Sequence, residues 1–163
     1  MLFDHCQECR KCCHVEPGYP PLEIPLRQAE RKQLGRIQVK TTCRFLGNGG
    51  CDLGQDKPYA CYQYPLSFDP HTLRFYFDAD CPLYDRYQQQ LRHKGSEALA
   101  HLNKVVETIA QMMGTDRRFL QRNHELDADY FELLPLSIPD EVLHALQKAA
   151  GAQNRWVSPK AES

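Results

Sequence analysis

The positions of the cysteines limit what this chain can fold into more than any other feature of the sequence. All eight lie within the first 81 of 163 residues, and four of them form the run Cys6-x2-Cys9-x2-Cys12-Cys13. Two cysteines separated by two residues direct both sulfurs toward one ion, because the backbone between them forms a tight knuckle. Three at this spacing with a distant fourth is also how bacterial ferredoxins hold iron–sulfur clusters. The run predicts metal ligation by thiolates.

The other four cysteines stand singly along the chain. Gly47, Gly49 and Gly50 lie between two of them, so that loop can bend sharply enough to bring both sulfurs to one centre. Cys81 precedes Pro82, a pair also found in ferredoxin-type runs. Eight thiolates would complete two four-ligand sites, or one site with spare thiols. The predicted metal ligands are Cys6, Cys9, Cys12, Cys13, Cys43, Cys51, Cys61 and Cys81.

Disulfide bonding and simple burial account for the cysteines less well than metal ligation does. A disulfide framework needs an oxidising compartment, but the first residues carry Asp4 and no apolar run, unlike a secretory signal. No stretch approaches the roughly 18 apolar residues of a membrane-spanning helix. We therefore expect a cytoplasmic protein with reduced thiols. Buried cysteines without a ligand role are common singly, but they do not account for four in one short run.

Composition narrows the classes of partner. The formal net charge is −1, which argues against a broad basic surface for nucleic acid or anionic lipid. Hydrophobic residues make up 42% and charged residues 25%, as in a soluble globular protein. We expect the partners to be a metal ion or cluster, with no nucleic acid and no membrane. A protein partner stays open.

The two halves of the chain predict different structure. Residues 1–88 contain most of the prolines, so we expect loops, a weak core and stabilisation by metal cross-links. Within them we predict one helix over Pro25–Leu34, ended by Gly35. We also predict a hairpin that pairs Leu73–Phe77 with residues near Tyr62–Phe68.

The pattern of residues 89–163 predicts helices. Ser96 is expected to cap a helix that ends at Gly114, and a shorter helix is expected over 116–124. A third is expected after Ser137, with a frayed tail after Gly151. The sequence thus predicts an α+β fold, in which a metal-centred first half with a short hairpin is packed against a helical second half as one compact domain.

Residues around the cysteines have weaker signals. His5 and His14 flank the run and could replace a thiolate, since imidazole is a zinc ligand, although a solvated histidine is the simpler interpretation. Tyr59, Tyr62 and Tyr64 are expected to pack around the site as a partly apolar shell that limits water access.

Four blocks in order complete a recognisable pattern: the Cys6 to Cys13 run, Cys43-Arg44-Phe45-Leu46, Cys51-Asp52-Leu53, and residues 57–65. Together they span about residues 6–82 and resemble the YkgJ-type cysteine-cluster family, also described as a CxxCxxCC zinc- or iron-chelating domain. The resemblance implies chelation by these cysteines, with zinc and iron–sulfur both proposed. The family usually has arginine before the proline of the last block, and often after its cysteine. Lys57 and Tyr62 stand there instead, which affects an ion pair but not the thiolates.

The type of metal and the question of catalysis stay open. Structural zinc domains usually have two paired knuckles, whereas this chain has knuckles at one end only, which favours a 4Fe–4S cluster over zinc. The alternative functions are an iron–sulfur redox enzyme or a protein-lysine methyltransferase, because some relatives are labelled flagellin lysine methylases. However, we find no glycine-rich turn for a nucleotide-like cofactor, and no base partner for a nucleophilic thiol. A metal carrier or redox sensor that uses Cys13 as an exchange ligand is a third hypothesis.

Overall fold

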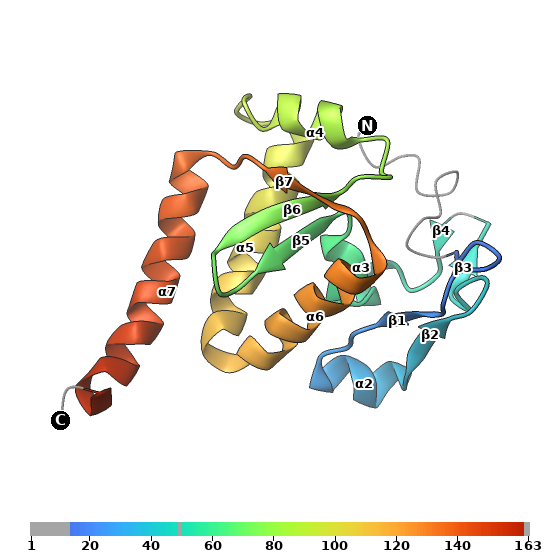
Figure 1. Ribbon diagram of the computed structural model, residues 1–163, viewed down its shortest axis with the longest axis horizontal. Helices are drawn as coiled ribbons and strands as arrows, with labels where there is room; N and C mark the ends of the chain where they lie inside the picture. Colours follow the sequence, from blue (N-terminus) through green and yellow to red (C-terminus); the bar gives the residue numbers. More distant parts are fainter. Residues whose placement is uncertain (1–13, 49, 162–163) are drawn as a thin grey trace.

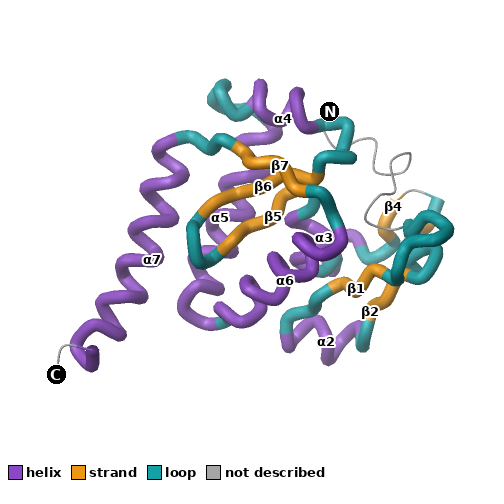
Figure 2. The backbone as a smooth tube through the Cα atoms, in the orientation of Figure 1, coloured by secondary structure: helices purple, strands orange, loops and turns teal. Residues whose placement is uncertain are grey.

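The computed structural model describes residues 14–48 and 50–161 and has an α+β fold, which confirms the predicted class. Helices surround a three-stranded antiparallel sheet (Figure 1), and a smaller part built of short strands lies to one side. Figure 2 shows that the smaller part contains more loop than the rest. The predicted ligands Cys6, Cys9, Cys12 and Cys13 lie outside the described residues.

The main sheet has the order β5-β6-β7, with β5 at Leu66–Asp69, β6 at Arg74–Asp78 and β7 at Leu133–Leu136. Leu66 pairs with Phe77, so the predicted hairpin is confirmed, although Tyr62 lies in a helix and not in the strand. The strand β7 was not predicted from the sequence. Its Pro135 is tolerated because β7 is an edge strand, where one missing backbone donor leaves no neighbour unpaired.

Four helices complete this part of the fold: α4 (Tyr84–Gln90), α5 (Glu97–Thr115), α6 (Arg117–Tyr130) and α7 (Asp140–Ala161). The helix α6 packs against β5, whereas α7 packs against α5. The predicted cap is confirmed, because the Ser96 hydroxyl oxygen accepts the Leu99 N–H at 3.2 Å. The helix α5 ends one residue beyond the predicted stop. The helix α6 is longer than predicted and α4 was not predicted. The helix α7 begins where expected but continues past Gly151, where a frayed tail was predicted.

The smaller part begins with β1 (Leu22–Ile24), α2 (Gln28–Leu34) and β2 (Ile37–Val39). The two strands pair antiparallel, and their alternating apolar residues are buried on one face. The predicted helix starts three residues later than expected and ends before Gly35 as expected. Gly35 has φ 71°, a left-handed conformation that favours glycine at a helix end.

The chain then forms the elements that carry the single cysteines. A short ribbon pairs β3 (Leu46–Gly47) with β4 (Gly50–Cys51). A 3-10 turn over Gly54–Asp56 leads into α3 (Tyr59–Gln63). These elements are too short to bury much surface by themselves, so neighbouring segments must hold them in place.

Two clusters of buried side chains account for the packing. The main core lies between the sheet and its helices, and residues on both sides of position 88 contribute to it, from Tyr59 to Leu146. The small core consists of Val15, Leu22, Ile24, Leu26, Ile37 and Val39. Along the described ranges, no helix is both long and apolar enough to cross a membrane.

Candidate metal site

Three of the predicted ligands lie together. Cys43, Cys51 and Cys61 line one cavity of about 10 Å³, although they come from a turn, the end of β4 and the middle of α3. The other lining residues are mostly apolar: Ile24, Ile37, Phe45, Leu53, Pro58 and Lys57. We call this the three-cysteine cavity. Sulfur is a ligand type that zinc accepts, and the volume of the cavity is about that of one water molecule.

The turn that carries Cys43 is fixed from two directions. Its carbonyl oxygen accepts the Leu46 N–H at 3.0 Å, which closes the turn into β3. The guanidinium of Arg44 donates to the carbonyl oxygens of Leu34 at 2.6 Å and Arg36 at 3.0 Å. These bonds fasten the turn to the end of α2. Cys43, Phe45 and Cys61 also pack against the small core.

The helix α3, which carries Cys61, is held at both ends. At its start, the Tyr59 N–H donates to Glu30 Oε2 at 2.8 Å, while Glu30 Oε1 accepts the Arg27 N–H at 2.8 Å. One carboxylate therefore caps α3 and joins it to the first turn of α2.

At the other end of α3, His101 from α5 contacts the carbonyl oxygen of Tyr62, the residue after Cys61. Its Nε2 lies 2.9 Å from that oxygen, and its Nδ1 lies 2.9 Å from the Tyr87 hydroxyl oxygen. Since a carbonyl only accepts, Nε2 carries the proton and Nδ1 accepts from Tyr87. Burial lowers the pKa of His101, so the ring is neutral at neutral pH.

Cys81 lies apart from the three-cysteine cavity. It is 5% exposed and belongs to the main core, at the turn between β6 and α4. Its N–H donates to the Asp78 carbonyl oxygen at 3.1 Å. The structure thus brings three of the four described cysteines to one cavity and places the fourth elsewhere.

His14 marks where the N-terminal run joins the described fold. It follows Cys13 directly in the chain and forms an antiparallel bridge with Thr42, the residue before Cys43. Its Nδ1 lies 3.2 Å from the Thr42 hydroxyl oxygen. Within residues 14–48 and 50–161, no group of three or more histidine, cysteine or acidic side chains has the arrangement of a metal site. Four of the predicted ligands, and His5, lie outside these ranges.

The three-cysteine cavity lacks the predicted tyrosine shell. None of Tyr59, Tyr62 and Tyr64 lines the three-cysteine cavity. Tyr59 packs edge-on against Phe119 in the main core, and the Tyr64 hydroxyl donates to Asp78 at 2.5 Å. Tyr59 and Tyr62 lie at other positions around the single turn of α3 than Cys61, and Tyr64 follows its end. Residues of β1, β2 and the loops form the apolar wall instead. The alternating apolar pattern of Leu22–Ile24 and Ile37–Val39 could have identified two of these residues, Ile24 and Ile37.

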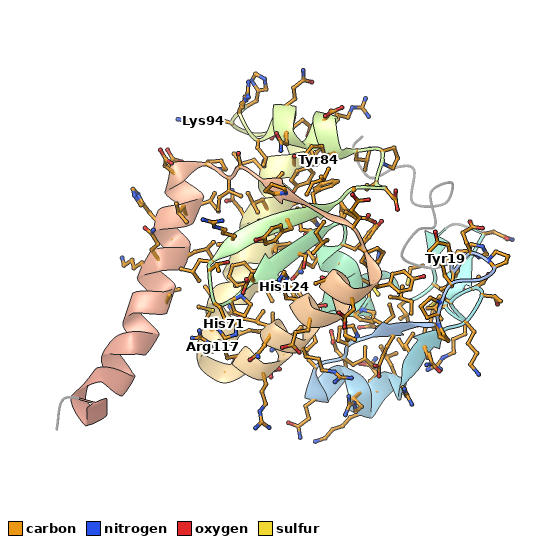
Figure 3. The ribbon with its side chains drawn as sticks, viewed as in Figure 1. Tyr19, His71, Tyr84, Lys94, Arg117 and His124 are labelled. Atoms are coloured by element: carbon orange, nitrogen blue, oxygen red, sulfur yellow. The ribbon has the colours of Figure 1, made fainter. Side chains whose placement is uncertain are left out.

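Apart from the three-cysteine cavity, a cluster of polar side chains joins β5 to α6. The Ser67 hydroxyl oxygen lies 2.9 Å from Nδ1 of His124, whose place beside the sheet is labelled in Figure 3. Ser67 also hydrogen-bonds the Asp127 carboxyl, and burial raises the pKa of Asp127 to about 7. The Nε2 of His124 lies 3.9 Å from Asp69, beyond hydrogen-bond distance. Ser67 is 1% exposed, so this end of the cluster lies in the interior between β5 and α6.

Comparisons with protein-family models, with curated proteins and with solved structures find no match to this chain.

Proposed function

We propose that this chain is a metal-binding protein that holds a metal centre through cysteine thiolates, with Cys43, Cys51 and Cys61 among the ligands. The observation that carries the proposal is the convergence of these three cysteines on one cavity from separate elements of the fold. Sulfur ligands from distant parts of a chain act as a cross-link when they share an ion.

The surroundings of the cavity support this proposal. Apolar side chains from β1, β2 and the loops wall it, and such a wall limits water access to a bound ion and strengthens thiolate ligation. Lys57 is the cationic residue among the lining side chains, and a positive charge nearby favours ionised thiols.

A fourth ligand is expected from the N-terminal run. Cys13 is bonded to His14, and His14 bridges to Thr42 beside Cys43, so the run joins the fold next to the cavity. This supports the finer prediction of a first half organised around a metal. The resemblance to the cysteine-cluster family and a reducing, cytoplasmic location are part of the same proposal.

The small volume of the cavity favours one ion over a cluster. A volume of about 10 Å³ is that of a single small ion and is smaller than a 4Fe–4S cluster. With four thiolates a zinc ion has no open coordination position, so its role would be to stabilise the fold and not to activate a water molecule. We therefore prefer zinc for this site.

Metal analysis of protein purified anaerobically, with a visible spectrum, tests the proposal. We expect at least about one zinc per chain and no colour. Cys61→Ser should lose this zinc, whereas Cys81→Ala, the matched control in the main core, should keep it. A broad band in the visible would assign an iron–sulfur cluster and contradict zinc. A folded protein without metal would contradict the whole proposal.

A further inference from the structure

Positive charge is concentrated in one segment of the small part. Residues 27–44 form α2, β2 and the turn that follows, and they contain six arginine or lysine residues but a single acid, so their formal charge is +5. Because the whole chain has a formal charge of −1, the rest of it carries −6. We call the exposed cations of this segment the basic surface: Arg31, Lys32, Arg36, Lys40 and Arg44.

Hydrogen bonds gather most of these cations at the end of α2. The guanidinium of Arg44 donates to the carbonyl oxygen of Leu34, the last residue of the helix, at 2.6 Å, and to that of Arg36 at 3.0 Å. Arg31 and Lys32 lie in the last turn of the same helix. Carbonyl groups at a helix end carry only about half a negative charge, so they offset little of the positive charge around them.

Acidic side chains offset little of it as well. Both oxygens of Glu30 already accept backbone N–H groups. One oxygen of Glu23 lies 3.5 Å from Nε of Arg36 and the other lies 3.1 Å from a terminal nitrogen of Arg122, so two cations share one carboxylate. In the part of the chain that the structure describes, four cations of the basic surface make no ion pair: Arg31, Lys32, Lys40 and Arg44.

We propose that the basic surface docks an acidic segment of a protein partner. Carboxylates complement its charge, and its size favours a short segment, because the seven residues of α2 span only about 10 Å. A nucleic acid or an anionic membrane would also approach the rest of the chain, whose charge of −6 repels it. Arg44 follows Cys43, so the partner would lie beside the three-cysteine cavity. The inference goes beyond the metal site and stands whether or not the cysteines hold zinc.

An NMR titration of the purified, metal-containing chain tests this inference. The probe is a hexaglutamate peptide, and hexaglutamine is the uncharged peptide of matched length. We expect saturable shifts of amides in residues 28–44 with hexaglutamate and none with hexaglutamine. Raising the salt concentration from about 0.1 M to about 1 M shortens the screening length from about 10 Å to about 3 Å, so most of the binding should be lost.

Two double variants separate the position of the charges from their number. Arg31→Gln with Lys32→Gln removes two charges from the basic surface, whereas Arg92→Gln with Lys94→Gln removes two exposed charges from the loop after α4, far from α2 in Figure 1. The first should weaken binding about tenfold, the effect of two exposed ion pairs, and the second should leave it unchanged. Glutamine is a good helix former, and the same spectra report whether each variant is folded.

Three results would overturn the inference. Hexaglutamate could produce no saturable shifts in residues 28–44, or the two double variants could weaken its binding equally. A short DNA duplex or vesicles of anionic lipid could also bind these residues more tightly than hexaglutamate, which would assign the basic surface to another class of partner.

Discussion

The main core and the small core are stabilised in different ways. The main core is enclosed by a three-stranded sheet and several helices, and its aromatic residues Phe68, Phe75, Phe77 and Tyr87 are at most 2% exposed. The small core has six aliphatic residues, most of them on the two short strands β1 and β2, with little regular structure around it.

Under the proposed function, this difference gives a reason for a metal cross-link beside the small core. Hydrophobic burial of about 25 cal/mol per Å² stabilises the main core without further cross-links. The elements around Cys43, Cys51 and Cys61 bury far less and are fastened by a few hydrogen bonds from Arg44, Glu30 and His101. Small structures with weak cores often depend on a bound metal. The comparison therefore predicts that metal loss affects one region and not the other.

The largest effect is expected from the main core. Phe77→Ala removes a fully buried ring from the central strand and should lower the free energy of unfolding by about 3–5 kcal/mol. Chemical denaturation with and without a zinc chelator measures it. The loss should be the same in both conditions, whereas a loss that depends on the chelator would show that the two regions unfold as one.

The next effect concerns the contact between the regions. His101→Leu removes both hydrogen bonds of the imidazole, including the one to the carbonyl oxygen of Tyr62 beside Cys61. We expect a loss of about 2–3 kcal/mol in stability and faster release of zinc to a chelator. His93→Leu, at an exposed position in the loop after α4, is the control. Unchanged zinc release in His101→Leu would show that α3 does not depend on this contact.

A smaller effect on the free energy of unfolding depends on pH and arises from Asp127, in the part of the molecule that contains the main core. Burial raises the pKa of Asp127 to about 7, so the folded chain keeps a proton that the unfolded chain releases near pH 4. The contribution of this group to stability is therefore lost as pH rises from about 4 to 7. Asp127→Asn should remove this dependence and stabilise the fold by about 1–2 kcal/mol at pH 8, because no charge is then buried. Parallel pH profiles of the two proteins would contradict this assignment.

The smallest effect tests the small region alone. Gly35→Ala places a side chain at φ 71°, where no neighbouring atom lies within 4 Å of the new Cβ. Only backbone strain remains, so we expect a local loss of about 1 kcal/mol. Hydrogen exchange should increase in α2 and β2 and stay unchanged in β5 and β6. An equal increase in all four elements would contradict independent local stability.

Local signals in the sequence predicted much of the main region. The hydroxyl of Ser96 and the apolar period after it located α5, and Asp69-Pro70 located the hairpin turn. The strand β7 was missed because Leu133–Leu136 contains a proline and pairs with residues 55 or more positions earlier, which no local pattern reveals. The helix α7 was predicted to fray after Gly151 because the sequence there is polar, yet it continues to Ala161.

The candidate site was predictable in its residue types but not in its grouping. The glycines between Cys43 and Cys51 predicted that these two could reach one centre, but no spacing shows that Cys61 joins them. The cap that Glu30 supplies to α3 places Cys61 at the same cavity. The same spacing does not show that Cys81 lies in the main core. Tyr59, Tyr62 and Tyr64 were predicted as a shell from proximity in sequence, but a helix places neighbouring side chains on different faces.

Hydrogen exchange before and after removal of zinc by a chelator tests the central claim most directly. We predict that amides of β1, β2, β3, β4 and α3 lose their protection when the metal is removed, while amides of β5, β6 and α5 keep theirs. Equal protection of residues 22–63 with and without metal would contradict the claim that thiolate ligation holds this part of the chain together.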